Sequence, residues 1–346
     1  MTLRIAQLAP VGRPVSAEST GSIEQIVSML SEELVARGHS VTLFATGDSE
    51  TSAELAALYS RGWAADPALW GWEFHELCHT ASALERAGDF DVVHSHAYHF
   101  ALPFTRFVST PIVHTYHVLI DDDVVRAYDR YPEAHLVSIS EFQRRVLNGR
   151  ADIPVIRHGV DTERFPFGSR TGDYLLFLGK LGWAKGPVEA IHVAREAGMP
   201  LVVAGAGDDD YFRHAVAPLL DAPGVEYVGW VGRERRNELL AGAAGLLYTI
   251  NAAETFGLVM VEAMACGTPV LALDRGAVRE IVTNGVTGYH APDLDALVEC
   301  VPKAVALDRA RIREHTVARF DRRRMVDEYE ALYRHVAANG SAPEAR

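Results

Sequence analysis

The chain has 346 residues, of which 48% are hydrophobic and 23% charged, a composition typical of a soluble globular protein with room for two domains. Its formal net charge of -13 argues against general nucleic-acid binding, which depends on clustered Lys and Arg, and against stable attachment to an anionic membrane.

The cysteines indicate a reducing compartment. Cys78, Cys266 and Cys300 are an odd, sparse set without metal-ligand spacing, so no disulfide framework is expected. Residues 1–10 predict one short strand without the apolar stretch of a signal peptide, and no apolar run reaches membrane-spanning length. We therefore expect a cytoplasmic protein, and the Ala- and Arg-rich composition is associated with high-GC bacteria.

Short apolar runs alternate with amphipathic segments in the first half of the chain. A helix is predicted over Ser22–Arg37, ending at Gly38. The predicted strands are Arg4–Leu8, Ser40–Ala45, Val92–His94, Ile112–Thr115 and Leu136–Ser138.

The second half repeats this alternation after a Pro- and Gly-containing linker at Arg164–Asp173. The predicted strands are Tyr174–Leu178, Leu201–Ala204, Glu226–Val228, Gly245–Thr249 and Val270–Leu273. The predicted helices are Pro187–Ala197, Tyr211–Leu220, Arg233–Ala241, Leu258–Ala265 and Val278–Val282, with a last helical pattern over Met325–Val336. This alternation predicts an α/β fold of two doubly wound, Rossmann-like domains with parallel sheets, facing each other across a cleft.

The most informative motif is a pair of glutamates eight positions apart, Glu254 and Glu262. The first is expected in a loop before the predicted helix, and the second about two turns further along it. Gly257 at the helix start offers backbone N–H groups to an anion, with Leu258 next to it. Two carboxylates beside a phosphate site suit the hydroxyls of a sugar and a ribose. The alternative interpretation is two solvated glutamates on an amphipathic helix.

Together with Phe256-Gly257-Leu258 and the segment 265–270, this pair resembles the Glu-x7-Glu signature of retaining glycosyltransferases of family 4. The resemblance implies the GT-B fold, with a C-terminal helix that crosses back to the first domain. The expected domains are residues 1–165 with 325–346, which bind the acceptor, and residues 166–324, which bind a nucleotide sugar. It further implies that Glu254 grips the sugar and Glu262 the ribose.

The segment 179–186 contains two lysines and three glycines after the first strand of the second half. Such a loop lets ammonium groups converge on a diphosphate, although a solvated surface loop is the plain alternative. It resembles the family's Gly-Arg…Lys-Gly motif, in which both cations neutralise the leaving diphosphate. Lys185 matches that motif, whereas Lys180 stands where Arg is usual and supplies a point charge rather than a bidentate fork.

Gly21 precedes the first long helix and resembles the family's Gly-Gly loop, with Thr20 in the place of the first glycine. The resemblance implies that Gly21 lets backbone N–H groups approach the donor phosphates; a plain helix-capping loop is the alternative. In the second half, Gly229, Trp230 and Val231 correspond to a family loop that packs the nucleotide base, against the alternative of a core turn.

The first half is rich in histidine, but without the spacing of a zinc site. By resemblance, His117 contacts a hydroxyl of the transferred sugar and His96 lines the acceptor side. His158 replaces the Asn of the family's Asn-Gly-Val-Asp segment, an exchange that bears on structure more than on chemistry. Ser140 is predicted to cap a helix. The acidic runs 121–123 and 208–210 are likewise predicted to cap helices, and this is favoured over their holding a metal ion.

The resemblance implies a metal-independent, cofactor-free hexosyltransferase that moves a hexose from a UDP-sugar, with UDP-glucose favoured, to a hydroxyl of a small soluble acceptor with retention. His117, Glu254 and Lys185 would be its catalytic residues. A GT-B nucleotide-sugar epimerase or phosphorylase, and a non-catalytic nucleotide-sugar-binding protein, remain alternatives. No nucleic-acid partner is expected, and a homodimer is left open.

Overall fold

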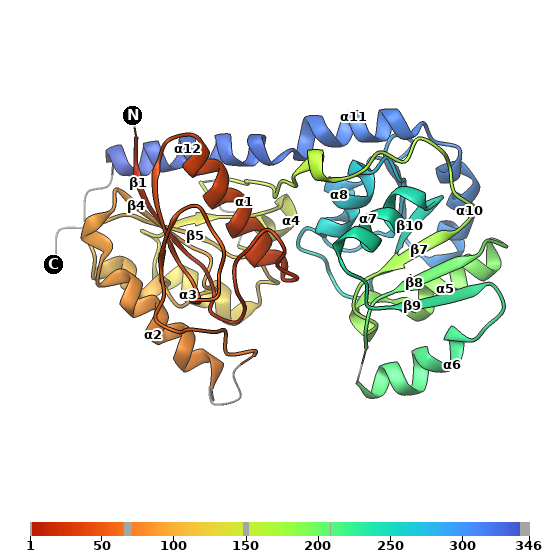
Figure 1. Cartoon of the computed structure of the whole chain (residues 1–346), viewed down its shortest axis with the longest axis horizontal. Helices are drawn as coiled ribbons and strands as arrows, with labels where there is room; N and C mark the ends of the chain where they lie inside the picture. The colour runs from red at the N-terminus through yellow and green to blue at the C-terminus, as the bar shows by residue number, and fades with distance from the viewer. Residues whose placement is uncertain (1, 66–70, 148–151, 208, 340–346) are drawn as a thin grey trace. The chain divides into compact units, whose positions relative to one another are not determined.

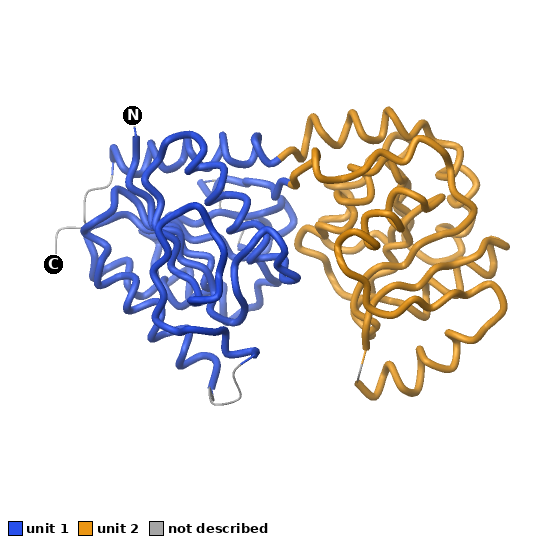
Figure 2. The backbone as a smooth tube through the Cα atoms, viewed as in Figure 1, with its two compact units in different colours: residues 1–159, 322–346 blue, residues 160–321 orange. Residues whose placement is uncertain are grey.

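A computed structural model describes residues 2–65, 71–147, 152–207 and 209–339 (Figure 1). The chain folds into two compact units, one of residues 1–159 with 322–346 and the other of residues 160–321 (Figure 2). Each unit contains a six-stranded parallel sheet with helices beside it. No helix within the described ranges is both long and apolar enough to cross a membrane.

The sheet of the first unit has the order β3-β2-β1-β4-β5-β6. Its strands are β1 (Arg4–Leu8), β2 (Ser40–Phe44), β3 (Glu54–Ala56), β4 (Val92–Ser95), β5 (Ile112–Thr115) and β6 (His135–Val137). The helices of this unit are α1 (Ser22–Ala36), α2 (Trp72–Leu84), α3 (Asp122–Arg130), α4 (Glu141–Val146) and α12 (Arg322–Asn339), with short turns η1 (Ala87–Asp89) and η2 (Leu102–Arg106).

The sheet of the second unit has the order β12-β11-β10-β7-β8-β9. Its strands are β7 (Leu175–Leu178), β8 (Leu201–Ala204), β9 (Val225–Gly229), β10 (Gly245–Tyr248), β11 (Val270–Leu273) and β12 (Gly288–Ala291). Its helical segments are η3 (Thr162–Arg164), η4 (Trp183–Lys185), α5 (Pro187–Glu196), η5 (Phe212–Val216), α6 (Ala217–Leu220), α7 (Arg233–Gly242), α8 (Leu258–Ala265), α9 (Val278–Ile281), α10 (Leu294–Val305) and α11 (Arg309–Phe320).

Both sheets follow the same winding. In each, the first strand lies at the centre, the next two extend to one side, and the last three extend to the other. The winding therefore reverses between β1 and β4 in the first unit and between β7 and β10 in the second. Loops that leave neighbouring strands at such a switch point diverge, which opens the crevice where doubly wound sheets bind ligands.

The C-terminal helix α12 belongs to the first unit, so the predicted crossing back is confirmed. Its Met325, Val326, Tyr329, Tyr333 and Val336 are buried at helical spacing. The helix contacts α1 and β4, and it runs beside α1 in Figure 1.

Along the chain, the boundaries between the units fall after residues 159 and 321, a few residues before the predicted domain boundaries of 165 and 324. The crossing segments are tied together inside the second unit, where Val160 N–H donates to the Phe320 carbonyl over 2.8 Å and the Thr162 hydroxyl donates to the Asp321 carboxylate over 2.5 Å. These bonds make residues 160 and 321 the ends of that unit.

The predicted strands and helices are present with small shifts at their ends, and the structure adds two edge strands and several helices. Strands β3 and β12 were missed: β3 has three residues and no buried side chain, and β12 contains Gly288, so neither has the apolar run of a central strand. Helices α2, α10 and α11 were also not predicted, whereas α3 begins within the acidic run that was expected to cap a helix.

Candidate active site

The loop between β7 and α5 carries Lys185 and is fixed against the loop that follows β10. Asn251 N–H donates to the Ala184 carbonyl over 3.0 Å, and the Asn251 side-chain amide donates to the Trp183 carbonyl over 2.9 Å. The Thr249 hydroxyl donates to the Gly186 carbonyl over 2.7 Å. The ammonium-bearing loop therefore lies at the switch point of the second unit.

Gly186 makes this close approach feasible. Its φ is +70°, and a Cβ on it would stand 1.8 Å from the Thr249 carbonyl oxygen. Any larger residue would combine a strained backbone with a collision against another backbone. The glycine of the lysine loop is thus required by the contact between the β7 and β10 loops.

Glu254 follows β10 and has a largely buried carboxylate, with 12% of its side chain exposed. One oxygen, Oε1, accepts N–H groups from Thr255 at 3.0 Å and Phe256 at 3.3 Å. The other, Oε2, accepts the Tyr248 hydroxyl and, at 3.3 Å, the Lys185 ammonium. Burial raises the pKa of Glu254, but Lys185, Tyr248 and Phe256 outweigh it, so the pKa lies below its usual value and the group stays ionised.

Helix α8 begins next to this carboxylate. Its N-cap is Gly257, at φ +84°, and no side chain caps the helix start. A Cβ on Gly257 would lie 3.2 Å from the Tyr248 hydroxyl and 3.3 Å from Glu254 Cγ. The start of α8 with Gly257 and Leu258, a cation and a carboxylate therefore lie close together, as an anionic sugar phosphate would require.

Tyr248 was not among the predicted site residues. Besides bonding Glu254, its ring lies 5.9 Å from the Lys185 ammonium. Burial, followed by the charge of Glu254, raises its pKa well above the usual value, so the phenol remains a donor. A tyrosine at the end of an apolar strand gives no sequence signal that separates it from a core residue.

Glu262 lies on α8 with 8% of its side chain exposed, and its carboxylate is 3.4 Å from the Arg236 guanidinium. It is therefore not a solvated surface glutamate. Arg236, on α7, is a second residue that the motif did not reveal.

Three glycines line the carboxyl ends of β7, β8 and β9. A Cβ on Gly205 would stand 1.8 Å from the Gly179 carbonyl oxygen, and Gly205 N–H donates to the Gly229 carbonyl over 2.8 Å. These three positions thus carry no side chain of their own, while the Tyr227 hydroxyl donates to the Gly205 carbonyl over 3.2 Å. Trp230 follows with 67% exposure, and Val231 is half-buried.

Two predicted phosphate-binding residues have less support. Lys180 is exposed, and no ion pair is described for it. Gly21, the N-cap of α1, lies under the Glu24 carboxylate, an oxygen of which is 1.9 Å from where a Cβ would be. A carboxylate at this place competes with an anionic ligand for the helix start, so phosphate binding at Gly21 stays a prediction.

Four histidines of the first unit belong to a continuous hydrogen-bonded chain of eight side chains. His158 Nε2 lies 3.2 Å from His117 Nδ1, and His117 Nε2 lies 2.8 Å from His96 Nδ1. His96 Nε2 then lies 3.0 Å from Gln7 Oε1, whose amide nitrogen donates to the Tyr333 hydroxyl over 3.2 Å.

The chain continues to helix α12. Tyr333 Oη is 2.5 Å from His94 Nδ1, His94 Nε2 is 2.8 Å from Thr115 Oγ1, and Thr115 Oγ1 is 3.1 Å from Tyr329 Oη. Strands β1, β4 and β5 are neighbours in the sheet, which brings Gln7, His94 and Thr115 together.

Gln7 sets the direction of this chain. Its amide oxygen only accepts, so His96 donates from Nε2 and accepts at Nδ1, and His117 in turn donates from Nε2 and accepts at Nδ1. Burial lowers the pKa of His117 to about 3 and that of His96 well below its usual value, so both rings are neutral at pH 7.

These bonds change the part assigned to His96. It is fully buried, and both ring nitrogens are engaged by Gln7 and His117, so it lines no surface that an acceptor reaches. It orients His117 instead. His117 is half-buried, and both of its nitrogens contact histidines, so contact with a sugar hydroxyl through nitrogen requires it to exchange one of these partners.

The helix-capping predictions hold where the structure describes them. Ser140 accepts from Gln143 N–H, Asp121 from Val124 N–H and Asp209 from Phe212 N–H. Asp208 lies outside the described residues. No group of three or more His, Cys, Asp or Glu side chains in the described part of the chain is arranged to hold a metal ion.

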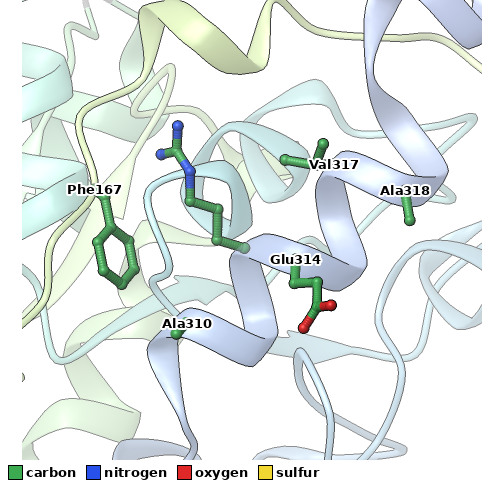
Figure 3. Close-up of a pocket in the computed structure, with 6 residues that line it drawn as sticks. Phe167, Ala310, Glu314, Val317 and Ala318 are labelled. Carbon is green, nitrogen blue, oxygen red and sulfur yellow. The ribbon is translucent and has the colours of Figure 1, made fainter.

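A separate shallow pocket of about 490 Å³ lies on the second unit (Figure 3). Phe167 and the α11 residues Ala310, Arg313, Glu314, Val317 and Ala318 line it. It contains none of the predicted site residues. Arg313 instead donates to the carbonyls of Thr162, Phe165 and Ala265 and fixes the start of the unit.

Known proteins match both units. The family described as Glycosyltransferase Family 4 matches residues 23–164, and that described as Glycosyl transferases group 1 matches residues 160–316. A glycogen synthase of Mycobacterium tuberculosis is 30% identical over 64% of this chain, but only 59% of its own length is covered. A phosphatidyl-myo-inositol mannosyltransferase of the same species is 25% identical, over 95% of this chain and 97% of the relative.

Solved structures share the fold over nearly the whole chain. AviGT4, a glycosyltransferase involved in avilamycin A biosynthesis, has a TM-score of 0.71 at 25% identity, covering 97% of this chain and 98% of that one. Anabaena HepE, solved in complex with UDP, has a TM-score of 0.72 at 18% identity, covering 97% of this chain and all of that one. The chain has the GT-B fold of these glycosyltransferase structures, and each of its two halves resembles a glycosyltransferase family.

Proposed function

We propose that this chain is a retaining hexosyltransferase that takes its sugar from a UDP-sugar, with UDP-glucose favoured, and gives it to a hydroxyl of a small soluble acceptor. The observation that carries this proposal is the convergence of Lys185, Glu254 and the uncapped start of α8 at the switch point of the second unit. A cation and free N–H groups suit a diphosphate, and a buried ionised carboxylate beside them suits sugar hydroxyls.

The remaining parts of a nucleotide sugar have matching partners in the same unit. The glycines that end β7, β8 and β9 carry no side chain, which favours the approach of a flat base to main-chain groups beside the exposed Trp230. Glu262 has a carboxylate for ribose hydroxyls and is held by Arg236. The structures of HepE with UDP and with UDP-glucose favour uracil as the base and glucose as the sugar.

In the mechanism we propose, the protein positions the reactants and stabilises charge. Lys185 and the N–H groups of Gly257 and Leu258 stabilise the departing diphosphate, and a phosphate oxygen takes the acceptor proton on the same face of the sugar. Glu254 holds the sugar by its hydroxyls. The reaction thereby retains the anomeric configuration and needs no metal ion.

A thermal-shift screen of nucleoside diphosphates and their sugars tests the donor. UDP and UDP-glucose should raise the melting temperature, since a ligand that binds only the folded state stabilises it, while GDP should leave it unchanged. Stabilisation by GDP alone would assign another base, and no stabilisation by any nucleotide would overturn the proposal. Transfer is then tested with UDP-glucose and a panel of small hydroxyl compounds.

The acidic net charge of -13 supports a small soluble acceptor over a lipid at an anionic membrane surface. Two assays separate the proposal from its alternatives. Release of an epimerised sugar without acceptor would indicate an epimerase, and dependence on inorganic phosphate would indicate a phosphorylase.

A further inference from the structure

The carboxylate of Glu254 already has a full set of hydrogen-bond donors. A carboxylate offers about four acceptor positions, and here Thr255 N–H, Phe256 N–H, the Tyr248 hydroxyl and the Lys185 ammonium occupy them. A sugar hydroxyl that donates to Glu254 must therefore take the place of one of these four groups.

The four donors differ in how easily they leave. The two N–H groups belong to the backbone of the same turn, and Tyr248 is a buried residue of a central strand, with 6% exposure. Lys185 reaches Glu254 from another loop by a long flexible side chain that is 42% exposed. An ion pair between a half-exposed lysine and a carboxylate contributes little net free energy, so Lys185 is the partner that exchanges.

We propose that donor binding moves the Lys185 ammonium from Glu254 to the diphosphate, and that a sugar hydroxyl takes the place of the ammonium on the Glu254 carboxylate. Tyr248 is then a positioning residue that holds this carboxylate for the hydroxyl. This inference rests on the proposed function, because it takes Lys185 as a diphosphate ligand. The exchange makes the two halves of the donor interdependent: the diphosphate removes a donor from Glu254, and the sugar supplies a new one.

A consequence distinguishes UDP from a UDP-sugar. UDP breaks the ion pair without giving a hydroxyl to Glu254, so a buried carboxylate loses a partner. A UDP-sugar repairs this loss. The Lys185–Glu254 pair therefore weakens the binding of the nucleotide alone and favours the complete donor.

Calorimetric titration of UDP and UDP-glucose tests the exchange. Glu254→Gln removes the ion pair, so it should bind UDP about two- to fivefold more tightly than the wild type. It should also lose most of the extra affinity for UDP-glucose over UDP. Unchanged or weaker UDP binding in E254Q, with an unaltered melting temperature, would overturn the exchange.

Glu189→Gln is the matched control. Glu189 accepts from the Asn251 side chain, so it contacts the same loop assembly but has no ion pair with Lys185 among the described contacts. The substitution removes the same unit of negative charge. UDP binding should stay within about twofold of the wild type. Equal tightening in E189Q and E254Q would show a general charge effect and contradict the exchange.

Tyr248→Phe tests the positioning residue, since it removes only the hydroxyl. UDP affinity should remain within twofold of the wild type. The ratio of UDP-glucose affinity to UDP affinity should fall at least threefold. An equal loss for both ligands would mean a merely structural role and overturn this assignment.

Lys185→Met separates this inference from the proposed function. If the wild type binds UDP and K185M binds it more weakly, Lys185 is a diphosphate ligand, and E254Q and Y248F then decide the exchange. If the wild type does not bind UDP, or K185M binds it equally well, the diphosphate assignment itself fails.

Discussion

Glu254 and Lys185 depend on each other at the level of single residues. The carboxylate remains ionised in a buried position because a cation, a phenol and backbone N–H groups surround it. The lysine in turn depends on the loop that Asn251 and Thr249 hold in place. Removal of either charged group should therefore affect the reaction far more than the fold.

Glu254→Ala and Lys185→Ala are each expected to lower kcat on the order of 10²-fold or more, as for the loss of one charge-stabilising group in an active site. The melting temperature of each variant, measured in parallel, should change by a few degrees at most. Steady-state rates with UDP-glucose check this. A kcat close to that of the wild type in either variant would contradict the assigned role.

His117→Ala should lower turnover more than UDP affinity, because His117 belongs to the first unit and the proposed nucleotide site belongs to the second. His114→Ala is the control, since His114 is a buried histidine of the same unit that bonds Thr105 and stands outside the histidine chain. Rate and UDP titration measure the two effects. Loss of UDP binding in H117A, or equal rate losses in H117A and H114A, would show that His117 has no special part.

Helix α5 has a left-handed glycine at each end, and their surroundings differ. Gly186 begins the helix at φ +70° in contact with Thr249, while Gly198 follows it at φ +65° with nothing within 4 Å of the position that a Cβ would occupy. The pair thus separates the cost of the backbone conformation from the cost of a collision.

Gly198→Ala is expected to cost about 1 kcal/mol of unfolding free energy, as for a non-glycine residue in a left-handed conformation. Gly186→Ala should cost more, because the Lys185 loop must move away from Thr249, and it should also weaken UDP binding severalfold. Urea unfolding and UDP titration of both variants check this. Similar effects of the two substitutions would mean that the contact with Thr249 does not position the loop.

Helix α12 connects to the histidine chain through Tyr329 and Tyr333. Its amphipathic pattern is visible in the sequence, but the bonds to Gln7, His94 and Thr115 join residues more than 200 positions away from it. The element that ends the described chain therefore bonds His94 directly and Thr115 beside it on the central strands.

For the whole molecule, buried titratable groups determine how stability varies with pH. Burial lowers the pKa of His114 and His117 to about 3 and that of His79 to about 4. Below the unfolded pKa of about 6.5, the unfolded chain binds protons that the folded chain does not, so acidification to these values removes stability. Glu76 has the opposite effect on stability. Burial raises its pKa to about 7, so the folded chain holds a proton that the unfolded chain loses, and stability falls as pH rises toward 7.

Glu76→Gln should therefore gain stability relative to the wild type as pH rises. Near pH 5 the wild-type carboxyl is protonated in the folded state, and the two proteins should differ little. By pH 8 it is ionised in a buried position, and the variant should be more stable on the order of 1–3 kcal/mol. Urea unfolding at both pH values measures this. A difference that does not change with pH would contradict the raised pKa.

The amino-acid sequence by itself determined the alternation of strands and helices and the division into two doubly wound units, and it indicated Lys185, Glu254 and Glu262 as candidate site residues. Those features are encoded locally, in apolar periodicity, glycine positions and the spacing of charged residues. Short edge strands such as β3 escaped prediction because they bury too little to need an apolar run.

Only the tertiary structure decided which groups satisfy the site. Tyr248 and Arg236 became visible as partners of the two glutamates, His96 moved from a surface role to a buried one, and Glu24 was found over Gly21. The physical reason is that a buried polar group must find a partner, and the partner comes from whichever strand or helix the fold brings beside it.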